Sequence, residues 1–105
     1  MPFINLTPHA IVIVDGPTFA PSGTVARCGV ISAHAGSHAG VNLSYTAYGE
    51  VIDLPDPSDG VYLIVSGLVR SAVPGRADVV SPGDLARDGA GVVIGCRGLV
   101  VNHPQ

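Results

Sequence analysis

The sequence predicts a small, mainly β protein: a single-domain barrel or sandwich of seven to eight short strands with one short helix. Short apolar runs rich in β-branched residues recur along the whole chain, as in all-β domains. Glycine, proline and aspartate clusters close most of these runs and mark turns. The 105 residues, 47% hydrophobic and 12% charged, suffice for one core and not for two. We therefore expect residues 1–105 to form one β-rich domain.

The first strands are expected in the N-terminal third of the chain. Residues 3–6 alternate briefly between apolar and polar, and residues 10–14 form a continuous apolar run. Residues 24–30 alternate well enough for a strand. The intervening residues 15–23 contain prolines that exclude a helix. This segment is therefore predicted to be a hairpin connection.

Residues 31–40 have the low-complexity sequence ISAHAGSHAG, which predicts a variable, His/Gly-rich loop at a hairpin tip. His34 and His38 are four residues apart, a spacing that places metal ligands on one face of a helix. Gly36 and Gly40 argue against a helix, and no third ligand lies nearby. We therefore predict no metal site.

Three further segments lead into the centre of the chain. Residues 41–45 alternate as a half-buried strand, and residues 47–54 continue it after a kink or bulge at Gly49. Residues 55–60 form a loop rich in proline and aspartate. Residues 61–65, VYLIV, read as a strand buried on both faces. We expect the fold to be organised around this last strand.

The C-terminal part is expected to hold the helix and the last strands. Ser66 can cap one or two helical turns over residues 68–73, which Pro74-Gly75 ends. Residues 76–80 return as an extended segment, and Ser81-Pro82-Gly83-Asp84 is predicted to be a turn. After the tight turn signal Asp88-Gly89, the remaining strands are expected at residues 92–97 and 99–101.

The number and type of charged residues indicate which classes of partner the chain can bind. The chain has no lysine, and its cations are Arg27, Arg70, Arg76, Arg87 and Arg97. Arginine suits bidentate contacts with carboxylate or phosphate. A net charge of −3 gives no basic field, so nucleic-acid binding is not expected. The low charged fraction predicts a homo-oligomer that buries part of the apolar surface.

The N-terminal segment and the cysteines bear on location. MPFINLTPH lacks the charged region and the apolar stretch of a secretion signal, so we expect a cytoplasmic protein. No run approaches the length of a membrane span, and no membrane association is expected. Cys28 and Cys96 fit no metal or redox spacing and are expected to be free thiols. His103 is expected to be exposed in the tail.

The candidate ligand-binding residues gather at the predicted helix. Ser66 and Gly67 lie at its start, where free backbone N–H groups can bind an anion. Arg70 and Arg76 could add charge-assisted contacts to a phosphate or carboxylate. In the alternative interpretation Ser66 only caps the helix and Arg76 pairs with Asp78 as part of the fold.

Thr7 and His9 are further candidates, because Pro8 fixes the backbone between them just before an apolar run. A structural role in the turn is favoured, and contact of His9 with a ligand is the alternative. Motifs of hydrolases, zinc proteases and P-loops are absent, and the glycines of residues 89–95 do not match a dinucleotide loop. We therefore expect no catalytic residues and no cofactor.

Several stretches together resemble a group of small proteins of phages, prophages and bacterial genomes. The shared stretches are Asn5-Leu6-Thr7-Pro8-His9, residues 21–27, residues 48–51 with Leu54-Pro55, residues 62–66, residues 76–83 and residues 94–97. The resemblance departs at residues 31–40. It implies a small cytoplasmic product of mobile elements, active in the host cell cytoplasm if a phage encodes it. Analogy with other small phage proteins adds an anti-defence role.

Two functions from different classes follow. In the first, the chain is a non-enzymatic β-barrel that sequesters a small anionic ligand, such as a nucleotide immune signal, at a subunit boundary. In the second, it is a protein–protein inhibitor of a host defence factor, or a structural accessory protein, and binds through its surface. A third reading is a small hydrolase that uses His9.

Overall fold

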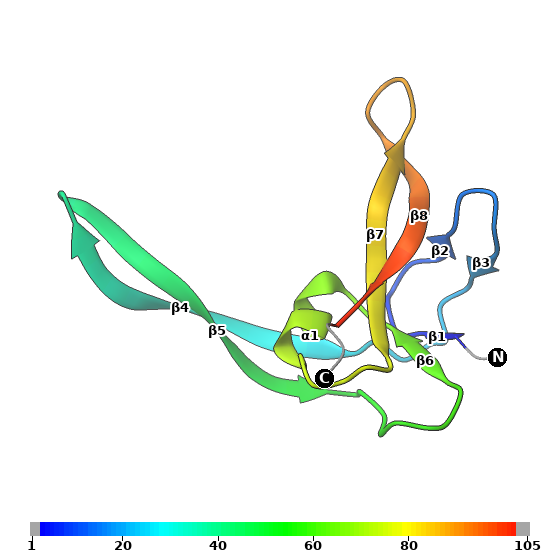
Figure 1. Ribbon diagram of the computed structural model, residues 1–105, viewed down its shortest axis with the longest axis horizontal. Coiled ribbons are helices and arrows are strands. Elements are labelled where there is room, and N and C mark those ends of the chain that lie inside the picture. The colour runs from blue at the N-terminus through cyan, green and yellow to red at the C-terminus, as the bar shows by residue number, and fades with distance from the viewer. Residues whose placement is uncertain (1–2, 103–105) are drawn as a thin grey trace.

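The computed structural model describes residues 3–102 and shows a mainly β protein with one short helix, as predicted (Figure 1). The strands are β1 (Phe3–Asn5), β2 (Ile11–Val12), β3 (Thr18–Phe19), β4 (Arg27–His38), β5 (Val41–Ile52), β6 (Tyr62–Ile64), β7 (Val79–Arg87) and β8 (Val93–Val101). The helix α1 (Gly67–Ala72) connects β6 to β7. Among residues 3–102, no helix is long and apolar enough to cross a membrane.

The strands form three separate sheets and do not close into a barrel. The largest sheet has the order β1-β6-β7-β8, in which β1, β6 and β7 are parallel and β8 is antiparallel to β7. Two antiparallel hairpins, β2–β3 and β4–β5, complete the fold. Because parallel neighbours need a crossover connection, α1 lies between β6 and β7 and covers the sheet.

The core lies where α1 packs on the parallel strands. Leu63, Val65 and Val79 from the sheet region and Val69 from α1 are buried together. Ile64 is fully buried as well. The apolar run at residues 61–65 is thus central, although Tyr62 remains 43% exposed at its start. The helix was predicted at residues 68–73, and it begins one residue earlier.

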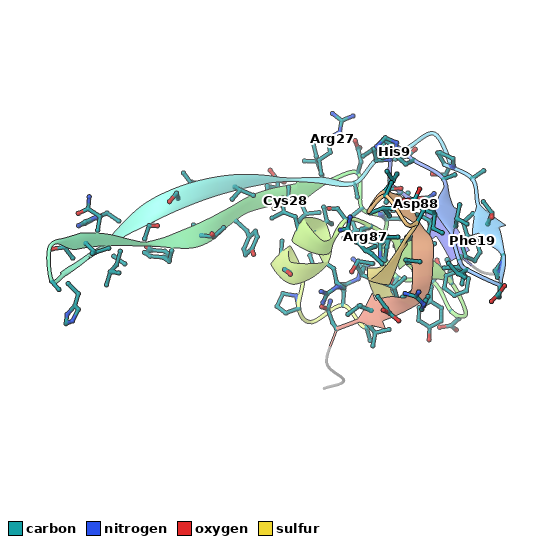
Figure 2. The ribbon with its side chains drawn as sticks, turned by 90° about the horizontal axis from the view of Figure 1, so that it is seen from above. His9, Phe19, Arg27, Cys28, Arg87 and Asp88 are labelled. Atoms are coloured by element: carbon teal, nitrogen blue, oxygen red, sulfur yellow. The ribbon has the colours of Figure 1, made fainter. Side chains whose placement is uncertain are left out.

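The hairpin β4–β5 leaves the body as a long arm, with Arg27 and Cys28 at its base (Figures 1 and 2). The predicted loop at residues 31–40 is therefore wrong for residues 31–38, which belong to β4. Gly36 was interpreted as a breaker, but it follows a β-bulge between His34 and Gly36 and has a φ of 115°. Only Ala39 and Gly40, with φ of 51° and 81°, form the turn at the tip.

A second bulge lies near the base of the arm. Cys28 pairs with Val51 and Val30 pairs with Tyr48, so β5 holds one extra residue between these two pairs. This extra residue lies at Gly49 or its neighbour, where a kink or bulge was expected. Beyond it, β5 is continuous from Val41 to Ile52.

The predicted turn at residues 81–84 is wrong, because β7 runs through it from Val79 to Arg87. Pro82 pairs with Leu99, while pairing with β6 ends at Val80. From Pro82 onward β7 therefore has a strand neighbour on only one side, and a proline without an N–H is tolerated there. Likewise β8 is one strand from Val93 to Val101, not the two that were expected.

The hairpin β2–β3 attaches to the outer edge of the main sheet. Ile13 forms a parallel bridge with Cys96, and the Val14 N–H donates to the Cys96 carbonyl oxygen at 2.8 Å. The hairpin connection predicted at residues 15–23 is wrong in its extent, because β3 lies inside it and pairs with β2, so that the turn is shorter. The strand expected at residues 24–30 begins at Arg27.

Candidate functional site

The candidate anion site begins at Ser66, which is the N-cap of α1. The Ser66 Oγ accepts a hydrogen bond from the Val69 N–H at 3.2 Å, and the Ser66 carbonyl oxygen accepts from the Arg70 N–H at 3.0 Å. Gly67 is exposed and opens the helix. The Ser66 hydroxyl thus has a structural partner, because it satisfies one of the free N–H groups at the helix start.

The Arg70 guanidinium is half-buried and bound within the chain. Its Nε donates to the Ser81 Oγ at 2.8 Å, and its Nη1 donates to the Asn102 Oδ1 at 3.1 Å. The Asn102 Nδ2 in turn donates to the carbonyl oxygens of Val73 and Arg76 at 2.8 and 3.1 Å. Arg70 therefore joins α1 to β7 and to the residue that follows β8.

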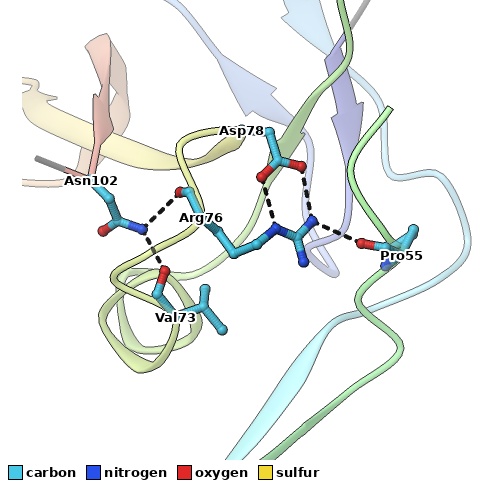
Figure 3. Close-up of polar contacts among 5 residues, drawn as sticks. All are labelled: Pro55, Val73, Arg76, Asp78 and Asn102. Atoms are coloured by element: carbon cyan, nitrogen blue, oxygen red, sulfur yellow. Dashed lines mark hydrogen bonds and ion pairs between the residues drawn. The ribbon is translucent and has the colours of Figure 1, made fainter. Parts of the chain in front are cut away.

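Arg76 forms a bidentate ion pair with Asp78, in the manner of the alternative interpretation (Figure 3). Its Nε and Nη2 each lie 2.9 Å from a carboxylate oxygen of Asp78, and Nη2 also donates to the Pro55 carbonyl oxygen at 2.9 Å. The hydrogen bond with Arg76 lowers the pKa of Asp78, against partial burial, which raises it. The same hydrogen bond raises the pKa of Arg76. This pair fastens the loop before β6 to the start of β7.

Thr7 and His9 form a turn organised by Asn5. The Asn5 Nδ2 donates to the carbonyl oxygens of His9 and Phe19 at 2.8 and 2.9 Å. Its Oδ1 accepts from the Thr7 N–H at 2.9 Å. The Thr7 Oγ1 lies 2.7 Å from the Asn5 Oδ1 and 2.9 Å from the His9 carbonyl oxygen, and its single proton serves one of them at a time. Thr7 is buried, whereas His9 is exposed on the body, away from the arm tip (Figure 2).

The topology brings Thr7 and Ser66 to the same edge of the main sheet, whereas Arg76 precedes β7 and lies at the opposite edge. Since β1 and β6 run parallel with Asn5 opposite Ile64, Thr7 and Ser66 both follow the carboxyl ends of neighbouring strands. Within residues 3–102, however, no hydrogen bond joins Thr7 or the His9 imidazole to Ser66, Arg70 or Arg76. The six candidates thus do not form one site, and they belong to separate structural networks.

Two hollows of the body are lined by residues other than the six candidates. An open groove of about 370 Å³ lies between β2, β7 and β8, and its lining is Ala10, Ile11, Val12, Pro82, Leu85, Val93, Ile94, Gly95 and Cys96. A smaller hollow of about 270 Å³ is lined by Ser58, Asp59, Gly60, Val61, Tyr62, Ala77 and Asp78. None of the six sequence-predicted residues lines either of these two hollows.

The arm has one mainly apolar and one mainly polar face. Along β5, alternation places Val41, Leu43, Tyr45 and Ala47 on one face, and the register adds their β4 partners His38, Gly36, Ala33 and Ile31. The opposite face carries Val30, Ser32, His34, Ser37, Asn42, Ser44, Thr46 and Tyr48. On the apolar face, Ile31 is 65% and Tyr45 58% exposed. We call the six apolar residues of the first face, which are the four of β5 with Ile31 and Ala33, the apolar arm face.

The other residues considered from sequence stay apart. His34 and His38 both lie exposed on β4, with the bulge between them. Among residues 3–102, no group of three or more histidine, cysteine, aspartate or glutamate side chains could hold a metal ion. Cys28 and Cys96 are free thiols on β4 and β8. His103 lies outside the described residues.

Sequence reasoning missed three features that the structure makes prominent: Asn5, Asn102 and the apolar arm face. The two asparagines are buried although asparagine is ordinarily exposed, and a lone asparagine beside an apolar run gives no sequence signal of its own. The arm face did leave a signal, because residues 41–45 alternate strictly. That pattern predicted a half-buried strand, and the structure shows a strand whose apolar side is uncovered.

Comparison with protein-family models, with curated proteins and with solved structures found no match to this chain.

Proposed function

We propose that this chain is a non-enzymatic protein-binding module of the structural accessory type, which assembles with itself through the β4–β5 arm. The observation that carries the proposal is the apolar arm face. It projects from a small body on a hairpin of two 12-residue strands, and its large side chains are exposed. An apolar surface of this kind, bordered by polar residues, is typical of a protein–protein contact.

The physics of a lone hairpin supports this proposal. A two-stranded ribbon without a third layer is at best marginally stable in water. Both outer edges of the arm expose unpaired backbone groups, and natural proteins protect such edges with charges or prolines. Residues 28–49 contain no charged residue and no proline. The arm therefore lacks the usual protection against association, and this suits a segment that another chain covers.

The small-anion function receives less support from the geometry. Ser66 caps the helix. Nε and Nη1 of Arg70 already donate to Ser81 and Asn102, and Nε and Nη2 of Arg76 already donate to Asp78 and Pro55. An anion at this place would have to compete with these partners. The candidate hydrolase residue His9 contributes only its carbonyl oxygen to the hydrogen bonds of its turn. Binding through the surface is therefore the better-supported function.

A matched pair of charge substitutions on β5 tests the proposal. Tyr45→Asp places a charge on the apolar arm face, and Thr46→Asp places the same charge one residue along, on the opposite face. Both positions are exposed, so both variants are expected to fold. Light scattering should show a dimer or larger particle for the wild type and for Thr46→Asp at micromolar concentration. Tyr45→Asp should instead give particles of 10.6 kDa.

Two results would speak against the proposal. If the wild-type protein stays at 10.6 kDa over the whole concentration range, it does not assemble with itself and the proposal is wrong. If the wild type assembles and Tyr45→Asp assembles equally well, some other surface than the arm makes the contact.

A further inference from the structure

We infer that the apolar arm face of one copy lies in the groove between β2, β7 and β8 of a second copy, and that the exchange is reciprocal about a two-fold axis. The inference rests on the proposed function and names the surface that receives the arm. Each copy would then supply one arm and one groove, so that two identical contacts close the dimer.

The arm and the groove match in chemical character. All nine residues that line the groove are apolar or glycine and proline, with Leu85, Val93 and Ile94 exposed at its rim. No charged residue lies between positions 28 and 49 of the arm. Neither the groove lining nor the arm therefore carries a charge that would select an oppositely charged partner. Burying the arm in the groove removes no charged group from water.

The arm and the groove of one chain do not cover each other. The arm leaves the body on one side, while β2, β3 and the β7–β8 hairpin lie toward the other side (Figure 1). The extent of 49 Å along the longest axis reflects this separation. Two apolar surfaces that remain apart in one chain can meet only between chains.

The area decides between two ways of pairing two copies. The apolar arm face spans residues 41–47 of β5, about 24 Å, and the ribbon is about 10 Å wide, so this face offers on the order of 240 Å². Two arms packed on each other would bury about 480 Å² in total, in the range of crystal-packing contacts. Two reciprocal contacts of an arm with a groove would bury about 1,000 Å², the area that a biological interface is expected to reach.

A photo-cross-link from the arm tests the inference. The photoreactive residue p-benzoyl-phenylalanine replaces Tyr45, and in a control protein it replaces Thr46 on the opposite face. Equal amounts of ¹⁴N- and ¹⁵N-labelled full-length protein are mixed, irradiated and digested with trypsin. Cleavage after arginine separates the arm peptide, residues 28–70, from the groove peptide, residues 88–97. We expect mixed-isotope products that join these two peptides from position 45, and loss of these products from position 46.

Ile94→Asp supplies a second readout on the groove. Ile94 is 54% exposed, so the substitution leaves the core intact, and it should abolish both the cross-link from position 45 and the dimer. Mixed-isotope products that join residues 28–70 to residues 28–70 would overturn the inference, since the arms would then pack on each other, and would leave the proposed function standing. The groove lining also includes residues 10–12 and residues 82 and 85, so products that join the arm peptide to residues 1–27 or 77–87 would equally support the inference. Products only at peptides outside the groove, or an unchanged dimer of Ile94→Asp, would overturn it likewise. A monomeric wild-type protein would overturn both.

Discussion

Buried polar side chains connect the elements of this small body. Asn5 joins β1 to the turn at His9 and to β3, and Asn102 joins the end of β8 to Arg70 of α1 and to Val73 after it. Among residues 3–102, every buried side-chain nitrogen or oxygen has a hydrogen-bond partner. Because an unpaired buried polar group costs about 1–3 kcal/mol, such networks hold short elements that bury little apolar area.

The pair of Arg76 and Asp78 should contribute to stability in a pH-dependent way. Its side chains are only 23% and 16% exposed, and the bonds are charge-assisted, so Arg76→Ala should lower the free energy of unfolding by about 1–3 kcal/mol at pH 7. The pKa of Asp78 is lowered in the folded protein. Its contribution is therefore complete above the unfolded pKa of about 4 and is lost as the pH falls through the folded value. Urea unfolding of both proteins at pH 7 and at pH 3 and below should show the difference shrinking in acid.

Arg97 provides the control for this experiment. It lies 3.6 Å from Asp84, with side chains 56% and 71% exposed. Arg97→Ala should change the free energy of unfolding by less than about 0.5 kcal/mol, because exposed pairs contribute little. An Arg76→Ala protein as stable as Arg97→Ala at pH 7 would show that the bidentate pair is not part of the fold's stability, and would free Arg76 for another role.

At the scale of elements, Gly95 sets how closely β2 approaches β8. A Cβ at position 95 would lie 2.8 Å from the Val12 carbonyl oxygen and 3.4 Å from the Val12 Cβ. Since that contact is with backbone, Gly95→Ala should displace β2 and lower the free energy of unfolding by about 1–3 kcal/mol. Gly98 lies on the same strand, and nothing lies within 4 Å of the position that its Cβ would take, so Gly98→Ala is the matched control. Equal unfolding midpoints for the two variants would mean that β2 does not depend on this close approach.

The elements that depend on local signals were predictable from sequence. The Ser66 cap followed by residues 67–72 produced the helix, and the Asp88-Gly89 signal produced the turn between β7 and β8. Within β7, by contrast, Pro82 was predicted to lie in a turn that ends the strand. The strand continues through Pro82, because the pairing of β7 with β6 has already ended there. The sequence alone does not show where that pairing ends.

The positions of the candidate residues relative to the helix were predictable from sequence, whereas their hydrogen-bond partners were not. Ser66, Arg70 and Arg76 do lie at and after the helix, where the sequence placed them. The sequence could not show that Ser81 and Asn102, 11 and 32 residues from Arg70, occupy its guanidinium. The arm escaped prediction for a related reason. Glycines at positions 36 and 40 resemble breakers in a local window, whereas a long cross-strand register accommodates them at a bulge and a turn.

At the scale of the whole molecule, the chain is more extended than its length requires. The radius of gyration is 16.1 Å, whereas about 13 Å is typical for a compact domain of this length. The arm accounts for the excess, since its residues lie outside the core cluster except at Cys28 and Val51. A shape of this kind leaves apolar area uncovered in one copy, and this area is available to stabilise an assembly.

An assembly that covers the arm makes stability depend on protein concentration. Because dimer formation stabilises the folded chain by mass action, each tenfold rise in concentration should add about 1.4 kcal/mol per mole of dimer. For two chains of this length the melting temperature should rise by roughly 3 °C for each tenfold step. Calorimetry at concentrations a hundredfold apart should show this rise for the wild type and for Thr46→Asp, and no rise for Tyr45→Asp. A wild-type melting temperature that is the same at both concentrations would mean that the apolar arm face stays in water, and the arm would then have to be stable as an isolated ribbon.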